Sequence, residues 1–279
     1  MWSQANTVTK VHSAPTISVV VPTRNSERTL ERCLQSIRGQ TVACELVVVD
    51  NESRDRTVAI ANRLADIVLV EGPERSAQRN AGLKATSGEY VGFIDSDMEL
   101  EPNVAQEAAE LLKRGAGGVT VPEYTAGSGF WVAVREWERH FYLGEDTVEA
   151  ARFFRRDVLD EIGGFDEDMP PGPEDWDLTI RVRSKQIVAR TAARIRHNEG
   201  TVTYIEACRK KAYYAPGLRH FQLKHGNAQL LTALSRVYLR HPWKLIYPHP
   251  LLGLGVVALK SGEAAAVAGA LIRRARQTS

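Results

Sequence analysis

The stretch Glu89-Tyr-Val-Gly-Phe-Ile-Asp-Ser-Asp97 leads a nearly continuous apolar segment into two carboxylates. Its composition predicts a buried strand of an open α/β sheet that ends in this charged pair. Ligands bind beyond the carboxyl ends of such strands, so Asp95 and Asp97 lie where a functional site is expected. Residues two apart on an extended chain point the same way, which lets both carboxylates face one ligand.

Two neighbouring carboxylates repel each other unless a positive charge lies between them. Hard oxygen ligands suit Mg²⁺ or Mn²⁺, which in turn bind phosphate oxygens. Asp95 and Asp97 therefore predict a cation and phosphate site. The alternative is a turn whose aspartates only cap the next helix.

The bulk composition is that of a globular protein. A chain of 279 residues is long enough for one large α/β domain, or for one domain with an appendage. Its three cysteines, Cys33, Cys44 and Cys208, are scattered and follow neither a disulfide nor a zinc pattern, which favours the reducing cytoplasm. Residues 1–15 are expected to form a loose polar tail, with no secretory signal.

Charge is distributed unevenly along the chain. Residues 205–279 contain 12 Lys and Arg against 2 acidic residues, so this part carries +10 and the preceding 204 residues carry −8. The acidic body argues against nucleic-acid binding. The basic and partly apolar end suits an anionic membrane surface or a phosphorylated acceptor.

Strand and helix patterns alternate through the first hundred residues. Apolar runs at residues 17–21, 45–49 and 67–70 predict strands, and apolar residues at helical spacing follow the first two. This is the pattern of βαβ units, which predicts a mostly parallel sheet with helices on both faces. A further predicted helix, ended by Gly88, places Arg79 near the same end of the sheet as Asp95; the alternative for Arg79 is a solvated charge.

Four motifs occur in order at the predicted strand ends. They are Val19-Val-Val-Pro-Thr-Arg-Asn25, Val47-Val-Val-Asp-Asn-Glu-Ser53, Arg79-Asn-Ala-Gly-Leu83 and Phe93-Ile-Asp-Ser-Asp97. In this order they resemble a family 2 glycosyltransferase with the GT-A fold, a Rossmann-like α/β architecture. The resemblance covers about the first hundred residues.

The resemblance implies a nucleotide-sugar site. In it, Arg79 helps to place the nucleotide, and Asp95 and Asp97 contact the ribose and a diphosphate-bound metal ion. One departure is visible, because many members have an aromatic residue at the position of Arg24 and an acid at that of Ser26. The residues implied to hold the base and ribose are Pro22, Thr23, Asn25 and Asp50.

The second half contains two stretches of the same character. Phe130 to Tyr142 is rich in aromatic residues that suit an acceptor cleft, but Trp131, Val134, Trp137 and Phe141 are interpreted as core contacts because they recur at helical spacing. Arg155 to Asp166 resembles the family's helix and Gly-Gly-Phe-Asp turn, which precedes the acceptor site.

The loop Pro170-Pro-Gly-Pro-Glu-Asp-Trp-Asp177 delivers three carboxylates to the start of a predicted helix. It resembles the family's catalytic carboxylate motif, which makes Asp175 the candidate base for the acceptor hydroxyl, with roughly a 10²–10⁴-fold effect. Glu174, Trp176 and Asp177 are candidates for acceptor binding or for a secondary role. The alternative is that the carboxylates only favour the helix N-terminus, by about 0.3–1 kcal/mol each.

A histidine follows this helix in the segment Arg194 to Gly200. Histidine is a common metal ligand, and in some relatives a histidine after the catalytic helix completes the metal shell, so His197 is predicted to join Asp97. The alternative is a structural histidine.

Further along, Arg209-Lys-Lys-Ala-Tyr-Tyr214 mixes cations with aromatic residues. Arg209 and Lys210 are interpreted as part of a flap over the sugar diphosphate or as a receiver of lipid phosphate. The alternative is a solvated helix face.

The last segment, residues 241–271, is apolar but interrupted by Lys260 and Glu263. No uninterrupted stretch reaches the 18 or so apolar residues of a spanning helix, so the sequence predicts a helix that lies on a membrane, with Arg273 to Arg276 facing anionic lipid. A packed helical appendage or a dimer contact explains the apolar residues equally well.

Together these observations predict a tail at residues 1–15, a GT-A domain at 16–204 and a basic helical region at 205–279. The nucleotide-sugar half of the domain is expected at 16–122 and the acceptor half at 123–204. The predicted protein is cytoplasmic, either free or attached to the inner face of the cell membrane.

The predicted activity is inverting transfer from a nucleotide diphosphate sugar, most simply a UDP- or GDP-sugar, with Mg²⁺ or Mn²⁺ as cofactor. The acceptor is a hydroxyl of a glycan, a lipid-linked sugar or a small molecule. A nucleotidyltransferase is a second hypothesis, although the first strand lacks its Gly-rich, lysine-bearing loop. A non-catalytic nucleotide-sugar-binding or membrane-docking module is a third.

Overall fold

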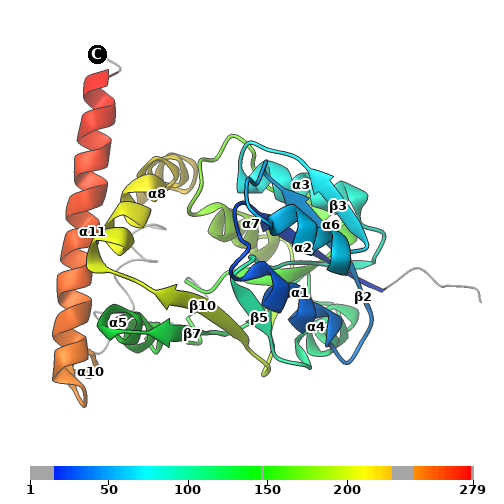
Figure 1. Ribbon diagram of the computed structural model, residues 1–279, viewed down its shortest axis with the longest axis horizontal. Coiled ribbons are helices and arrows are strands. Elements are labelled where there is room, and N and C mark those ends of the chain that lie inside the picture. Colours follow the sequence, from blue (N-terminus) through cyan, green and yellow to red (C-terminus); the bar gives the residue numbers. More distant parts are fainter. Residues whose placement is uncertain (1–15, 142, 146–147, 228–241, 278–279) are drawn as a thin grey trace, which may run out of the picture.

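A seven-stranded sheet runs through the middle of the protein in the order β3-β2-β1-β4-β8-β6-β9 (Figure 1). The computed structural model describes residues 16–141, 143–145, 148–227 and 242–277, so the predicted tail at 1–15 lies outside the described residues. The strands of this sheet, from one edge to the other, are β3 Ile67–Val70, β2 Cys44–Asp50, β1 Ile17–Thr23, β4 Tyr90–Phe93, β8 Ala151–Arg155, β6 Gly118–Thr120 and β9 Val188–Arg190.

The sheet is mostly parallel, as predicted. β1 pairs in parallel with β2 and β4, and β2 with β3, while β8 runs antiparallel to both β4 and β6. The parallel part is built from β-branched strands buried on both faces, which is what helices on either side require. The alternation of strands and helices in the sequence therefore produced the expected core.

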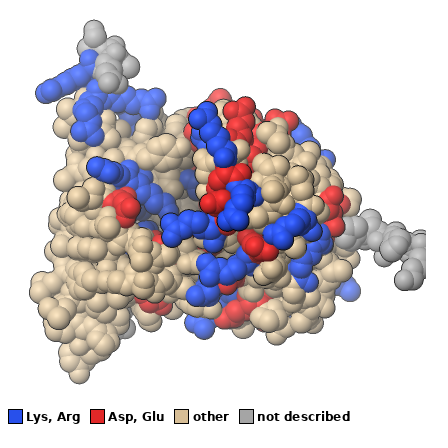
Figure 2. Space-filling view, in the orientation of Figure 1, with Lys and Arg blue, Asp and Glu red and all other residues tan. Residues whose placement is uncertain are grey.

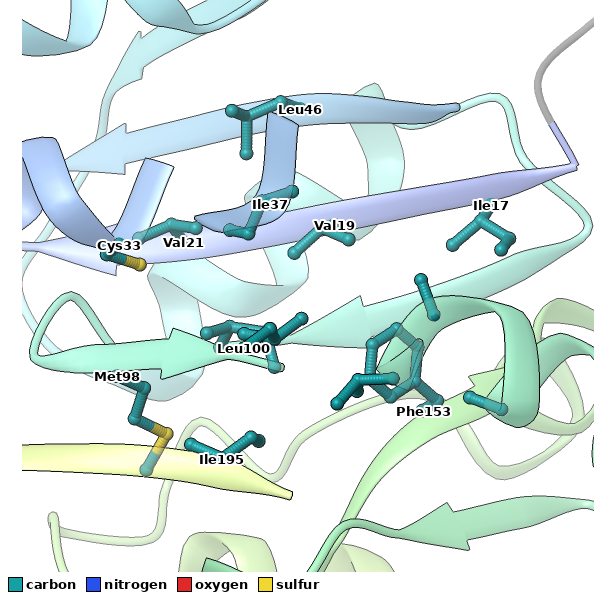
Figure 3. Packing of buried hydrophobic residues seen from close by; sticks show 14 of the residues in the cluster. Ile17, Val19, Val21, Cys33, Ile37, Leu46, Met98, Leu100, Phe153 and Ile195 are labelled. Carbon is teal, nitrogen blue, oxygen red and sulfur yellow. The ribbon is translucent and has the colours of Figure 1, made fainter. Parts of the chain in front are cut away.

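Helices cover both faces of the sheet. Alternate residues of β1 point to opposite sides, so Ile17, Val19 and Val21 join one core cluster and Val20 joins the other. Figure 3 shows the first cluster around β1. On that face lie α1 Leu30–Arg38, α2 Thr57–Leu64 and α4 Val104–Lys113, and on the other lie α3 Arg75–Ala85, α6 Arg156–Ile162 and α7 Glu174–Arg183.

Close packing of α3 on the sheet depends on Gly82. A β-carbon at this position would lie 2.3 Å from a methyl carbon of Val20 and 3.1 Å from one of Val49. Only glycine lets the helix backbone come this near to β1 and β2. The glycine of the Arg79-Asn-Ala-Gly motif therefore sets the depth of the helix that carries Arg79.

A second, three-stranded sheet was not predicted from the sequence. It consists of β5 Met98–Leu100, β10 Ile195–Thr201 and β7 Glu123–Ser128, in that order. Its middle strand carries His197 and pairs antiparallel with β5, directly after Asp97. Strands this short give little periodic signal, and their partners are far away in the sequence.

The C-terminal helices lie on the side of the domain that carries the three-stranded sheet (Figure 1). They are α8 Tyr204–His225, α10 Pro242–Ile246 and α11 Pro250–Gln277, and α11 packs along α8 and α5 Phe130–Arg139. Val134 of α5 lies in an apolar cluster with Val256 and Leu259 of α11, and Trp131 and Trp137 pack against it. The interpretation of these aromatic residues as core contacts is confirmed.

The length of α11 adds to what the sequence predicted. No uninterrupted apolar stretch of spanning length was expected, and Lys260 and Glu263 do interrupt the apolar residues of the helix, but Pro250–Arg276 is long and apolar enough to cross a membrane by length and composition. Lys260 interrupts the apolar residues of the sequence, but in the folded protein its charge is paired with carboxylates. In the structure its ammonium turns inward and contacts Glu138 at 2.6 Å and Glu263 at 2.8 Å.

Candidate active site

A cleft opens beyond the carboxyl ends of β1 and β4, with a volume of about 440 Å³. We call it the Asp97 cleft. Six of the predicted site residues line it, namely Pro22, Thr23, Asp95, Asp97, His197 and Lys210. Sequence reasoning missed other lining residues, among them Asn51, Arg75, Gln78, Arg135, Tyr213 and Tyr214.

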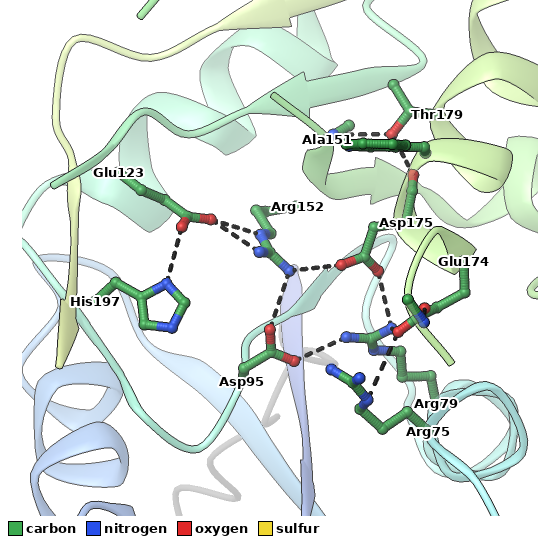
Figure 4. Close-up of polar contacts among 12 residues, drawn as sticks. Arg75, Arg79, Asp95, Glu123, Ala151, Arg152, Glu174, Asp175, Thr179 and His197 are labelled. Atoms are coloured by element: carbon green, nitrogen blue, oxygen red, sulfur yellow. Dashed lines mark hydrogen bonds and ion pairs between the residues drawn. The ribbon is translucent and has the colours of Figure 1, made fainter. Parts of the chain in front are cut away.

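Beside the cleft, the guanidinium of Arg79 is fully buried and holds three carboxylates (Figure 4). It contacts Asp95 at 2.7 Å, Asp175 at 2.8 Å and Glu174 at 3.1 Å, while the ring of Phe165 lies 5.1 Å from its central carbon. The alternative that Arg79 is a solvated helix charge is therefore wrong. Because its side chain has no exposed surface, it places the site through the carboxylates rather than by touching a ligand in this conformation.

Arg152 forms a second bridge that sequence reasoning missed. Its guanidinium is 3.5 Å from Asp95, 3.2 Å from Asp175 and 2.8 Å from Glu123 (Figure 4). An arginine between the buried residues Ala151 and Phe153 of β8 is the signal that was available, because a charge in a buried strand needs partners.

Burial and neighbouring charges pull the pKa values of the aspartates apart. Burial raises the pKa of Asp95, but Arg79 and Arg152 outweigh it and hold the value well below the usual range. Burial raises the pKa of Asp175 above the usual range, although Arg79 and Arg152 oppose the shift. A carboxylate with a raised pKa is better suited to accept a proton.

His197 faces Asp97 as predicted. Its Nε2 lies 3.3 Å from Oδ2 of Asp97, and its Nδ1 lies 3.1 Å from Oε2 of Glu123. Burial lowers the pKa of His197, but the carboxylates of Asp97 and Glu123 outweigh it and raise the value to about 9. The contact between Nδ1 and Glu123 fixes the orientation of the imidazole ring.

The Asp97 and His197 pair suits a hard divalent cation. Two ligands at right angles on an octahedral ion, each at about 2.1 Å, lie about 3 Å apart, and the observed separation is 3.3 Å. Among the residues that the structure describes, no three His, Cys, Asp or Glu side chains form a metal cluster on their own. Substrate oxygens and water would therefore complete the shell, as is usual for Mg²⁺ at phosphates.

A second pocket, of about 250 Å³, lies on the other side of Arg152. We call it the Lys211 pocket, after the lysine of α8 that lines it. Asp175, Trp176 and Glu123 line it, and the indole N–H of Trp176 donates to the carbonyl oxygen of Val148 at 2.8 Å. Arg135 lines both this pocket and the Asp97 cleft.

Two residues predicted to touch the nucleotide make hydrogen bonds that organise loops. Asp50 is fully buried, and its carboxylate accepts hydrogen bonds from the backbone and hydroxyl of Ser53. Asn25 has φ 48° and accepts a hydrogen bond from the backbone N–H of Arg54. Neither side chain lines the Asp97 cleft, whereas Asn51, next to Asp50, does.

Two of the acidic residues at the start of α7 are also taken up by internal contacts. Glu174 accepts a hydrogen bond from the backbone N–H of Gly172 at 2.6 Å and binds Arg79. Asp177 is buried and contacts Lys224 at 2.9 Å and His225 at 2.7 Å, which ties α7 to α8. These contacts fit the secondary role for Asp177 that the sequence left open.

The predicted flap is part of helix α8. Lys210 on this helix lines the Asp97 cleft together with Tyr213 and Tyr214, and the hydroxyl of Tyr214 accepts a hydrogen bond from Arg75 at 3.1 Å. Arg209 is exposed and lies outside the lining of both pockets.

A family model, "Glycosyl transferase family 2", matches residues 18–165. This is just over half of the chain, and it contains β1, β4 and the Asp95 and Asp97 motif of the Asp97 cleft. The chain belongs to glycosyl transferase family 2. The resemblance noted in the sequence is confirmed.

Curated family 2 relatives match at modest identity. The pre-mycofactocin glycosyltransferase of Mycobacterium tuberculosis is 28% identical over 284 residues, covering 93% of this chain and 57% of the relative. The putative glycosyltransferase EpsH of Bacillus subtilis is 33% identical over 113 residues, covering 38% of this chain and 32% of the relative. The chain spans between about a fifth and somewhat over a half of the curated relatives that it matches.

Solved structures share the fold. The mannosyltransferase PcManGT of Pyrobaculum calidifontis, in complex with GDP-Man and Mn²⁺, superposes with a TM-score of 0.60 at 20% identity, covering 96% of this chain and 80% of that one. S. aureus TarS 1-349 in complex with UDP-GlcNAc gives a TM-score of 0.53 at 18% identity, covering 95% and 92%. The predicted GT-A fold is confirmed.

Replacing Arg79 with methionine should destabilise the protein strongly. The substitution leaves Asp95, Glu174 and Asp175 without their shared cation, and breaking a buried ion pair on one side costs about 3–5 kcal/mol. Urea unfolding followed by circular dichroism measures the loss. Arg63→Met is the matched control, because the pair of Arg63 with Glu31 is exposed, and its effect should stay within about 0.5 kcal/mol. Equal stability of Arg79→Met and the parent would contradict the network.

Proposed function

We propose that this chain is an inverting glycosyltransferase that moves a sugar from a nucleotide diphosphate sugar to an acceptor hydroxyl. The observation that carries the proposal is the Arg152 bridge, which joins Asp95 of the Asp97 cleft to Asp175 of the Lys211 pocket. The donor diphosphate on one side and the acceptor on the other then meet at these carboxylates. Inversion rests on the family resemblance.

The donor is proposed to occupy the Asp97 cleft. Thr23 supports this, because its hydroxyl oxygen is buried and has no hydrogen-bond partner among the described residues. The fold neighbours were solved with GDP-Man and with UDP-GlcNAc, which favours a GDP- or UDP-sugar here. Lys210 and Arg75 supply positive charge along the same wall.

A Mg²⁺ or Mn²⁺ ion is proposed as the cofactor, and the Mn²⁺ in the PcManGT complex favours this choice. Asp97 and His197 would hold the ion, and Glu123 would orient the imidazole. When bound, a divalent ion neutralises charge that develops on a departing diphosphate.

Asp175 is proposed to act as the general base. Its carboxylate takes the proton of the acceptor hydroxyl while the hydroxyl oxygen forms its bond to the anomeric carbon. The bond from that carbon to the diphosphate oxygen breaks in the same step, and the nucleoside diphosphate leaves. Arg79 and Arg152 hold Asp175 in place through both of its oxygens.

The rival functions differ in their products. A nucleotidyltransferase would release pyrophosphate, whereas this proposal requires release of a nucleoside diphosphate. A non-catalytic module would bind a nucleotide sugar without turnover. The geometry favours an enzyme, because a binding module does not need a buried carboxylate with a raised pKa between two pockets.

A lipid-linked or cell-envelope glycan is proposed as the acceptor, with peripheral attachment to the cytoplasmic face of a membrane. The outward side of α11 exposes Leu251, Leu254, Val257 and Ile272, with exposed fractions of 46% or more. In Figure 2 the lower part of this side is free of charge, while Lys and Arg gather at its C-terminal end. Because α11 also packs along α8 and α5, lying on a membrane suits it better than crossing one.

Nucleotide binding tests the donor site. Thermal unfolding with UDP, GDP, ADP, CDP and dTDP, each with and without Mn²⁺, should show a metal-dependent shift for one nucleotide, because a ligand at 100 times its dissociation constant adds about 2.7 kcal/mol. Asp97→Ala and His197→Ala should abolish the metal-dependent part. Glu110→Ala, an exposed acid on α4, is the control. Absence of a shift with every nucleotide would count against the donor site.

Loss of the base should lower turnover and change its pH dependence. Asp175→Asn, once shown by circular dichroism to be folded, should reduce the rate of nucleoside diphosphate release about 10²–10⁴-fold. In the parent, activity should fall as the pH drops through the raised pKa of Asp175, because the protonated carboxyl accepts no proton. This acidic limb should vanish in the variant. Full activity of Asp175→Asn would contradict the assignment, and the exposed Asp160→Asn serves as the control.

Membrane attachment is tested by flotation with vesicles containing anionic lipid. The parent protein should float, and Leu254→Glu combined with Val257→Glu should stay at the bottom, because charges on the outward face of α11 oppose insertion. Ile187→Glu changes an equally apolar side chain, 74% exposed, on the catalytic domain and should leave flotation unchanged. Failure of the parent to float would remove the basis for the membrane proposal.

A further inference from the structure

One cation of the Lys211 pocket contacts no carboxylate among the residues that the structure describes. Among the described residues, no hydrogen bond or ion pair within 4.0 Å is found for the ammonium group of Lys211. Each of the other cations that line the pocket contacts at least one carboxylate. These contacts join Arg135 to Glu199, Arg139 to Glu123, Arg152 to Asp175 and Lys260 to Glu138.

The nearest negative charges to Lys211 are already engaged. Glu138 and Glu263 attract its ammonium electrostatically, but both carboxylates contact Lys260 directly, at 2.6 and 2.8 Å. Burial, followed by repulsion from Lys260, lowers the pKa of Lys211 below its usual value. A charged ammonium group in a partly buried site lowers the stability of the protein unless an anion binds beside it.

Helix α8 explains why Lys211 points here. Consecutive residues of a helix are rotated by about 100° from each other, so Lys210 lines the Asp97 cleft and Lys211 lines the pocket beyond it. The helix thus supplies one lysine to each side of the carboxylates. Asp175 lies in the same pocket as Lys211.

We propose that the Lys211 pocket binds an anionic group of the acceptor, a phosphate or a carboxylate, with Lys211 as its counter-ion. This rests on the proposed function and adds the acceptor's chemical class. The pocket, of about 250 Å³, has the volume of about eight water molecules, which suits one small anionic unit. Anchored on Lys211, that unit presents a neighbouring hydroxyl to Asp175 and takes no part in bond formation.

Anion binding is measured with inorganic phosphate, methyl phosphate and acetate, on protein saturated with its nucleoside diphosphate and Mg²⁺ so that the Asp97 cleft is filled. Titration calorimetry of the parent should detect phosphate or acetate, and the stronger of the two identifies the class. Lys211→Met should weaken that binding at least tenfold, while Lys211→Arg should retain it. Lys185→Met removes a lysine that pairs with Glu161 on the surface and should bind as the parent does.

Thermal unfolding adds a readout that distinguishes a ligand site from a structural contact. In buffer without these anions, Lys211→Met should unfold at the same or a higher temperature than the parent, because it removes an unpaired buried charge at similar volume. Added phosphate should stabilise the parent more than Lys211→Met, and the difference excludes general salt effects, which act on both.

The proposal is overturned if the parent binds none of the anions, or if Lys211→Met binds them equally well. If Lys211→Met does not fold, the proposal is tested on the parent protein instead. Acylation of Lys211 by acetic anhydride, followed by peptide mass spectrometry, should then slow in phosphate relative to Lys185, and equal rates would contradict the proposal. If no nucleotide binds, the titrations are run without it, so failure of the donor site and failure of the Lys211 pocket are separately visible.

Discussion

The buried guanidinium of Arg79 is the interaction on which the rest of the site depends. It gathers Asp95, from the end of β4, and Glu174 and Asp175, from the start of α7, around one charge. A buried arginine is tolerated only when carboxylates surround it, and those carboxylates in turn need the arginine. Gly82, one helical turn further along α3, lets this helix lie close enough to the sheet for the charge to reach them.

Around Arg79 the protein forms two separate sites, which differ in the charge that each is proposed to bind. The Asp97 cleft presents a carboxylate and an imidazole for a cation, with lysine and arginine side chains along its walls. The Lys211 pocket lies across Arg152 and contains Asp175, whose pKa is raised by burial. The same two arginines touch both aspartates, but Arg75 and His197 further lower the pKa of Asp95, whereas Glu174 and Asp95 add to burial in raising the pKa of Asp175.

The C-terminal region contributes residues to the active site as well as to the protein surface. α8 closes the site and is tied to α7 by Lys224 and His225, both of which contact Asp177. α11 packs on α8, and the two charged residues within its apolar stretch, Lys260 and Glu263, turn inward. The polar residues that interrupt the apolar sequence therefore stabilise the docking of the helix, and they leave its outer face apolar.

The sequence by itself determined the alternation of strands and helices, the GT-A fold and the placement of Asp95, Asp97, His197 and Asp175 near one end of the sheet. The alternation and the position of Asp95 and Asp97 follow from periodicity, a local property of the chain, whereas the GT-A fold and the assignment of His197 and Asp175 to the site rest on the resemblance of the motifs to the family. Only the tertiary structure decided that Arg79 is buried, that Arg152 and Glu123 complete the site, that Asp50 turns inward and that Lys211 contacts no carboxylate in the part of the chain that the structure describes. Each of these depends on side chains far apart in the sequence, and on burial, because desolvation and charge pairing exist only once the chain is folded.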